Sequence, residues 1–89
     1  MKFPDGKSYE GQFRDGKFNG RGIYAWPSRH RYEGQFQDGK FDGQGIEIYS
    51  DGSRYEGQFR NDKPNGHGVF TSPSGQRYDG QWSDGDRVI

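Results

Sequence analysis

Leucine and cysteine are absent from this chain of 89 residues, and only 26% of its residues are apolar. Ordinary globular chains contain roughly 45–50% apolar residues when glycine is counted, so a thick two-layer core is not expected. Without cysteine the chain has neither a disulfide framework nor a thiolate zinc site. The apolar side chains must therefore be buried by something other than aliphatic packing.

Net charge is also lacking, because 13 basic residues balance 13 acidic ones. A neutral chain has no overall field to attract nucleic acid, so we expect no nucleic-acid partner. No apolar run approaches the ~18 residues of a transmembrane helix, and the opening MKFPDGKS lacks the apolar region of a signal peptide. We expect a cytoplasmic protein, at most peripheral to a membrane or to the cytoskeleton.

Aromatic residues and glycine take the place of the missing aliphatic residues. The chain has seven Phe, six Tyr, two Trp and 16 Gly. Disordered chains are usually poor in aromatics and rich in net charge, so this composition favours a folded chain. Each ring can cover on the order of 150–250 Å², and glycine offers bare backbone on which a ring can lie.

The sequence repeats with a period of 23 residues. Tyr9, Tyr32 and Tyr55 each begin the segment YEGQF, and Tyr78 begins YDGQW. In each full unit a turn segment, a Gly-x-Gly and a β-branched residue follow, which is strong evidence for a repeat array. We interpret the chain as one array in which residues 1–8 end a preceding unit, residues 9–31, 32–54 and 55–77 are full repeats, and residues 78–89 are an incomplete fourth repeat.

Each unit is predicted to form a β-hairpin, because apolar and polar residues alternate on both sides of an Asp-Gly pair. A two-residue turn at Asp15-Gly16 sets the register of the two strands. Continued along the hairpin, this register predicts the pairs Phe13 with Phe18, Gly11 with Gly20, Tyr9 with Gly22 and Glu10 with Arg21.

The links between hairpins are predicted to contain three residues. A two-residue turn at Asp51-Gly52 would put Tyr55 on the wrong face, whereas the link Ser50-Asp51-Gly52 keeps the faces consistent. It pairs Gly45 with Gly57 and Glu47 with Tyr55, and glycine at its third position suits a left-handed bulge conformation. Arg29 stands at that position in the first link, which is therefore expected to be longer or strained.

These registers predict an all-β fold, a single-layer, strongly twisted antiparallel meander built from about three and a half hairpin repeats. One face is aromatic and glycine-rich, and the other is charged. Rings that lie across glycine stabilise such a sheet, as in the aromatic rescue of glycine. The structural glycines predicted on the aromatic face are Gly11, Gly20, Gly22, Gly34, Gly43, Gly45, Gly57, Gly66, Gly68 and Gly80.

The unit YEGQFRDGKFNGRGIYAWPSRHR and its copies resemble MORN repeats, named for membrane occupation and recognition nexus. The family pattern runs Tyr-Glu-Gly-x-Trp/Phe-x-Asp-Gly-Lys-x-x-Gly-x-Gly, and the resemblance covers essentially the whole chain. It implies an elongated hairpin array with an aromatic-lined groove, and a scaffold or recognition module whose partner varies. Pro64 departs from the aromatic residues Phe18 and Phe41 of the other units and thins the aromatic row.

Function is predicted to reside in the aromatic groove, because aromatic side chains are enriched in interface hot spots. A protein or peptide partner is expected. An alternative that stays open for each ring is that it is simply part of the core; Tyr24, Trp26 and Tyr49 lie farther from the glycines and are favoured as contacts. The candidate partner-binding residues are Tyr9, Tyr24, Trp26, Tyr32, Tyr49, Tyr55, Phe70 and Tyr78.

Open sheet edges, near Phe3 and after the strand of Tyr78, suggest a second kind of contact. Open edges pair or must be protected. We expect either that the chain is a fragment of a longer array or that it forms a homo-oligomer by edge pairing.

Basic residues near the hairpin tips suggest an alternative function, weak binding of an anionic phospholipid headgroup. Acidic neighbours cancel much of their attraction to a membrane. The candidate lipid-binding residues are Arg14, Lys17, Lys40, Arg60 and Lys63.

An enzyme is not expected. The chain has no cysteine nucleophile, and its histidines, His30 and His67, recur in no other unit. A catalytic dyad or triad also needs a water-excluding pocket, and the histidines lack partners at metal-ligand spacing. We expect no catalytic residue, no metal and no cofactor.

Overall fold

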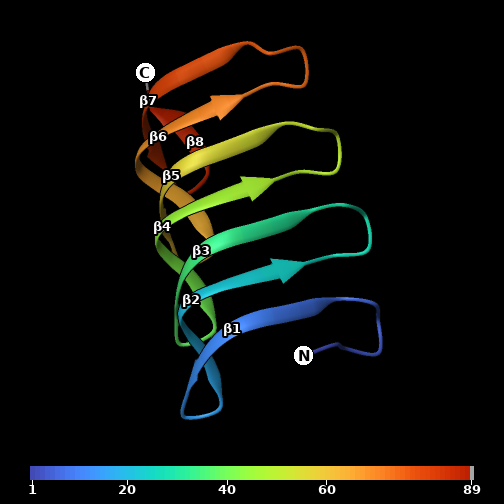
Figure 1. The fold of residues 1–89 in the computed structure, drawn as a ribbon. Coiled ribbons are helices and arrows are strands. Elements are labelled where there is room, and N and C mark those ends of the chain that lie inside the picture. The colour runs from blue at the N-terminus through green and yellow to red at the C-terminus, as the bar shows by residue number, and fades with distance from the viewer. Residues whose placement is uncertain (89) are drawn as a thin grey trace.

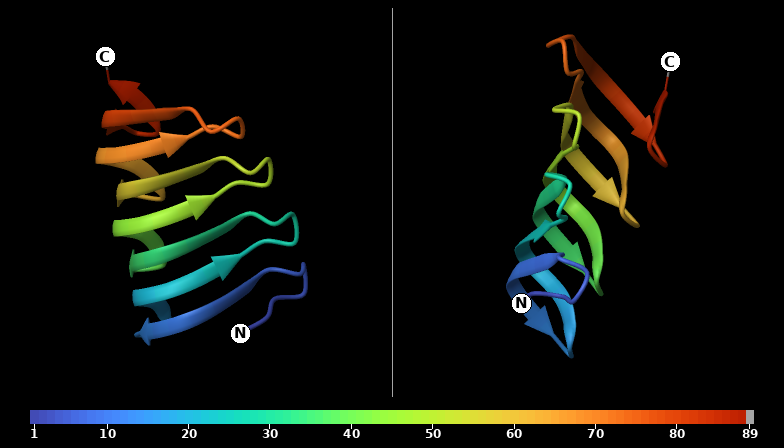
Figure 2. Two further views of the ribbon diagram at one scale, coloured as in Figure 1. Left: turned by 45° about the horizontal axis from the view of Figure 1, so that its top comes forward. Right: turned by 90° about the vertical axis from the view of Figure 1, so that its right-hand side faces the viewer.

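The computed structural model describes residues 1–88 and contains one antiparallel sheet whose eight strands follow one another in chain order (Figure 1). The predicted all-β meander is confirmed. The sheet extends 38 × 24 × 15 Å, and both views of Figure 2 show its strands in one twisted layer. The strands are β1 (Ser8–Arg14), β2 (Lys17–Ala25), β3 (Arg31–Gln37), β4 (Lys40–Ile48), β5 (Arg54–Arg60), β6 (Lys63–Thr71), β7 (Arg77–Ser83) and β8 (Asp86–Val88).

Two-residue turns join the strands of each hairpin. In the first tip, Asp15 and Gly16 have φ angles of 52° and 77°, as a type I′ turn requires. The third tip has Asn61 and Asp62 in the same conformation, with φ angles of 51° and 71°. Asp62 thus has a left-handed conformation at the turn position that glycine occupies in the other tips.

The predicted hairpin register is correct beside the tip and wrong beyond it. Phe13 pairs with Phe18 as expected, but Gly11 pairs with Gly22 instead of Gly20. Between these pairs β2 has two more residues than β1, so the strands form a bulge. Beyond the bulge, Tyr9 pairs with Tyr24 and Glu10 with Ile23, in place of the predicted Gly22 and Arg21.

A glutamine side chain closes this bulge in every full unit. Gln12 Oε1 accepts a hydrogen bond from the Arg21 N–H at 2.8 Å, so a side-chain amide replaces the backbone partner that the bulge removes. The same bond joins Gln35 Oε1 to Gln44 N and Gln58 Oε1 to His67 N, at 2.6 and 2.8 Å. The register change is therefore a built feature of the repeat.

The ten predicted glycines do not share one role. A Cβ built on Gly45 would collide with the ring of Tyr32, as expected for glycine beneath a ring. A Cβ on Gly43 would meet the Gln35 amide, and Gly43 has a φ of 95°. Gly20, Gly43 and Gly66 therefore belong to the bulges, which corrects their placement beneath rings, and a Cβ on Gly80 would meet nothing within 4 Å.

The links between hairpins have the predicted three-residue geometry. Gly45 pairs with Gly57, and Glu47 with Tyr55. The first link keeps the same register, because Tyr24 pairs with Tyr32. Arg29 in this link has a φ of 70°, a strained value for a residue other than glycine. The first link is therefore strained and not longer than the others.

Hydrogen bonds between tips tie each unit to the one before it. The backbone N–H of Gly39 donates to Phe18 O at 2.9 Å, and that of Gly85 donates to Pro64 O at 2.9 Å. At the tip between them, Asp62 N donates to Phe41 O at 3.1 Å. These bonds align the tips along one side of the sheet, while the links line the other side (Figure 1).

We predict that Gly45→Ala destabilises the array by about 1–3 kcal/mol, because the new methyl group overpacks the site beneath Tyr32. Gly80→Ala is the matched control, since it lies in a strand with open space at its Cβ. Urea unfolding followed by circular dichroism measures both. Equal stability of the two variants would show that the packing of the Tyr32 ring does not require glycine at position 45.

Candidate functional site

The tyrosines that begin each full repeat form the core. Tyr9, Tyr32 and Tyr55 are at most 1% exposed. The Tyr32 ring stacks on Phe41 at a centroid distance of 3.8 Å and an interplanar angle of 7°, and its Oη donates to Gln35 O at 2.6 Å. Because these three rings have no surface left, their prediction as partner-binding residues is wrong.

A second set of rings stays half-buried and forms a continuous row, which we call the aromatic row. Tyr24 packs on Trp26 at 4.7 Å, and Tyr49 on Phe70 at 6.4 Å. His30 joins the two pairs, since its ring lies 3.9 Å from Trp26 and 5.4 Å from Tyr49. Tyr78 lies next to the end of the row, 6.3 Å from Phe70. The remaining predicted contact residues therefore lie together on one face; the aromatic row is Tyr24, Trp26, Tyr49 and Phe70.

An apolar hollow of about 250 Å³ opens at one end of the aromatic row, and we call it the aromatic hollow. Two of its walls, Tyr24 and Trp26, belong to the row, and its other rings come from β2, β3 and β4. Two residues of the hairpin tips also line it, one of them a carboxylate. Its lining residues are Phe18, Tyr24, Trp26, Phe36, Phe41, Gly39 and Asp62.

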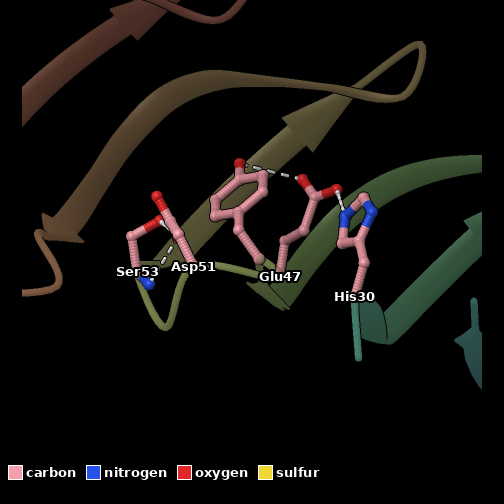
Figure 3. A network of polar contacts seen from close by, with 5 residues as sticks. His30, Glu47, Asp51 and Ser53 are labelled. Atoms are coloured by element: carbon pink, nitrogen blue, oxygen red, sulfur yellow. Dashed lines mark hydrogen bonds and ion pairs between the residues drawn. The ribbon is translucent and has the colours of Figure 1, made fainter. Parts of the chain in front are cut away.

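A polar network supports the row beside this hollow (Figure 3). Glu47 is only 7% exposed, and its Oε2 lies 2.6 Å from His30 Nε2. Its Oε1 accepts a hydrogen bond from Tyr49 Oη at 3.1 Å. Since His30 also stacks face to face on Trp26, the buried carboxylate fixes the imidazole that holds the Trp26 ring.

Burial is the main cause that raises the pKa of both Tyr32 and Tyr49 far above its ordinary value. The negative charge of nearby Glu47 raises the pKa of Tyr49 further. Burial also raises the pKa of Tyr9 and Tyr55. The phenols of these four tyrosines are therefore neutral hydrogen-bond donors near neutral pH.

A comparison with known protein families identifies the chain. The sequence model of the MORN repeat matches residues 9–31, 32–54, 55–77 and 78–88. The chain belongs to the MORN-repeat family. A search of curated proteins finds no match. MORN repeats are non-catalytic modules that generally serve binding or scaffolding, and no catalytic family matches the chain.

The opposite face of the MORN sheet is charged and largely self-neutralising. Arg31 lies 3.7 Å from Glu33, and Arg54 lies 3.4 Å from Glu56. A wider hollow of about 760 Å³ lies on this face, lined in part by Arg54, Glu56 and His67. Two of its basic side chains already face carboxylates, so the aromatic side is the better candidate site.

The five predicted lipid-binding residues are all exposed at three successive MORN hairpin tips. Arg14 pairs with Lys17 across the first tip, and Arg60 with Lys63 across the third. An aspartate lies within or beside the turn of every tip, including the second, where Lys40 lies. The structure therefore brings these five cations to one side of the array together with three aspartates, Asp15, Asp38 and Asp62.

Metal binding and membrane spanning have no support in residues 1–88. The described side chains contain no group of three or more His, Asp or Glu that could hold a metal ion. The same part of the chain has no helix long and apolar enough to cross a bilayer.

Sequence reasoning missed the pair His30 and Glu47. One signal was present, because Glu47 occupies the unit position at which the other repeats have Tyr24 and Phe70. A carboxylate in an otherwise aromatic position needs a partner when it is buried. His30 likewise replaces Ser53 and Gln76 of the other links.

We predict that stability falls at alkaline pH because the buried tyrosines must ionise on unfolding. A tyrosine whose pKa is raised in the folded state stabilises the array fully below its unfolded pKa of about 10. As pH rises further, each such tyrosine lowers the free energy of unfolding by about 1.4 kcal/mol per pH unit while it stays protonated in the folded state. Urea unfolding across the alkaline range measures this decline.

Tyr32→Phe is the control for this pH dependence. The phenyl ring still covers Gly45 but has no proton to lose, so the variant should be less stable at neutral pH and lose less stability as pH rises. A decline equally steep in the variant and in the parent would contradict the assignment to Tyr32.

Proposed function

We propose that this MORN array is a protein-binding module whose contact surface is the aromatic row. The observation that carries the proposal is the division of the rings into two sets. Packing on glycine and against phenylalanine rings leaves the tyrosines of the core at most 1% exposed, whereas Tyr24, Trp26, Tyr49 and Phe70 stay half-buried. Rings that the core leaves partly exposed are the kind of residue that forms interface hot spots.

The geometry of the row favours an extended peptide as the partner. From Tyr24 to Phe70 the row crosses successive units through contacts of 3.9 to 6.4 Å. The four rings of the row lose little conformational entropy on binding, because packing already restricts them. A peptide lying along the row would contact rings from more than one repeat.

Phospholipid binding by the hairpin tips has weaker support. A basic residue near an anionic membrane surface contributes about 1 kcal/mol, but here Asp15, Asp38 and Asp62 accompany the cations at the tips. The aromatic row faces no such cancellation, since apolar contact does not depend on net charge.

Edge pairing between copies is a second proposed activity. β8 pairs with only Gln81–Ser83 of the seven-residue strand β7 within the described chain. Asp79 lies in β7 just before this short pairing, so another strand added to this edge would pair at Asp79. Light scattering over a range of concentrations should show a rising mass, and the variant Asp79→Pro should remain smaller because proline removes a ladder donor. A constant monomeric mass would contradict edge pairing.

The aromatic-row proposal predicts that Tyr24→Ala and Tyr49→Ala each weaken peptide binding about tenfold or more. The ligands are peptides selected against the parent array from a random library, with affinities measured by calorimetry. Gln44→Ala, an exposed residue beside the charged hollow, is the matched control and should leave affinity unchanged. Circular dichroism verifies that each variant is folded.

One result of these measurements would contradict the aromatic-row proposal. If folded Tyr24→Ala and Tyr49→Ala proteins keep the parent affinity while Gln44→Ala loses it, the partner binds the charged face and the proposal is wrong.

A further inference from the structure

The rings that line the aromatic hollow are inclined to one another instead of forming one flat stack. Trp26 and Phe41 lie 6.1 Å apart with an interplanar angle of 87°, and Phe18 and Phe36 lie 5.9 Å apart at 79°. Tyr24 is tilted by 56° from Trp26. The rings therefore line an open box of about 250 Å³, in which Phe18, Tyr24 and Trp26 are partly exposed and Phe36 and Phe41 are buried.

A single carboxylate completes this box. Asp62 lines the hollow from the third hairpin tip, and its Oδ1 accepts a hydrogen bond from Phe41 N at 2.9 Å. Among residues 1–86 no lysine or arginine forms an ion pair with Asp62, although Lys63 is its neighbour in sequence. The hollow therefore combines aromatic rings with one negative charge that has no basic partner.

We propose that the aromatic hollow binds the trimethylammonium group of a trimethylated lysine on the partner protein. Aromatic faces attract cations through the ring quadrupole, and quaternary ammonium groups are recognised in this way. The inference rests on the proposed function, since the rest of the partner would lie along the aromatic row. A protein-borne cation is favoured because Tyr49 and Phe70 continue the row past the hollow.

The chemistry of the walls selects the methylated form of lysine. An unmodified ammonium has three N–H donors, and five rings with one carboxylate cannot replace the water molecules that it would lose. A trimethylammonium group has no N–H donor, so its methyl groups can contact the rings while the charge faces Asp62. Arginine, with five donors, is disfavoured for the same reason as unmodified lysine.

The site occurs at one place in the array. Moving each lining residue on by one period of 23 residues puts Glu47 in place of Tyr24, Pro64 in place of Phe41 and Gly85 in place of Asp62. The next unit thus lacks two of the rings, and its carboxylates, Glu47 and Asp62, stand at the positions of Tyr24 and Gly39 instead. The expected stoichiometry is one trimethyllysine per chain.

His30 acts here as a positioning residue. It covers one side of the Trp26 ring at 3.9 Å, and buried Glu47 holds it at 2.6 Å. This support keeps Trp26 at a steep angle to Phe41, which preserves the box when no ligand is bound.

The test compares two probes of the same shape, N-acetyl-trimethyllysine amide and its neutral analogue with carbon in place of the ammonium nitrogen. Binding is followed by the NMR shift of the Trp26 indole. The charged probe should bind about tenfold more tightly than the neutral one. Equal binding of both would overturn the cation site and leave the protein-binding proposal standing.

Asp62→Asn keeps an oxygen for the Phe41 N–H and removes only the charge. This variant should bind the charged probe several-fold more weakly than the parent and bind the neutral probe equally well. Asp84→Asn, the same change at the fourth tip, is the control and should have no effect on either probe. If Asp62→Asn and Asp84→Asn behave alike, the carboxylate has no role in the site.

The headgroup of phosphatidylcholine also carries a trimethylammonium group, so vesicles of this lipid test whether the ligand is a lipid instead of a protein. We expect them not to sediment the chain. If they sediment it and the trimethyllysine probe does not bind, the ligand is a lipid headgroup and the proposal is wrong.

Discussion

The packing of tyrosine rings onto bare glycine backbone is the interaction on which the rest of this array depends. A single sheet has no second layer to bury its apolar side chains, so each ring must find cover within its own layer. Tyr32 lies over Gly45 on one side and against Phe41 on the other, at 3.8 Å, and is fully buried. An apolar core as thin as one ring is possible because glycine lets the backbone itself serve as a packing surface.

The glutamine-closed bulge places those glycines where the rings need them. Two extra residues in β2 bring Gly22 into register with Gly11, beneath the ring of Tyr9. The Gln12 amide restores the hydrogen bond that the bulge would otherwise leave unmade. The rings outside this core lie near the link ends of β2, β4 and β6, and the MORN sheet presents them as the aromatic row.

Period and face alternation were enough to predict the repeat, the meander and the registers across the links. The hairpin registers could not be predicted beyond Phe13, because the bulge depends on a side-chain bond from Gln12 that leaves no trace in the hydrophobic pattern. Tyr32 and Tyr24 are chemically identical, yet Tyr32 lies in the core and Tyr24 at the surface. Their neighbours in space decide this difference. The sequence marks Glu47 as unusual in its unit position, but His30 lies 17 residues away, and the fold was needed to identify it as the partner of Glu47.

The most direct test of the tyrosine–glycine packing is the NMR chemical shift of the glycine Hα protons. A ring that lies over a glycine shifts the Hα proton beneath its face strongly upfield. Gly22, Gly45 and Gly68 lie beneath Tyr9, Tyr32 and Tyr55, whereas Gly80 faces open space. The account predicts upfield-shifted Hα signals for those three glycines and an ordinary one for Gly80. Ordinary shifts for all four would contradict it.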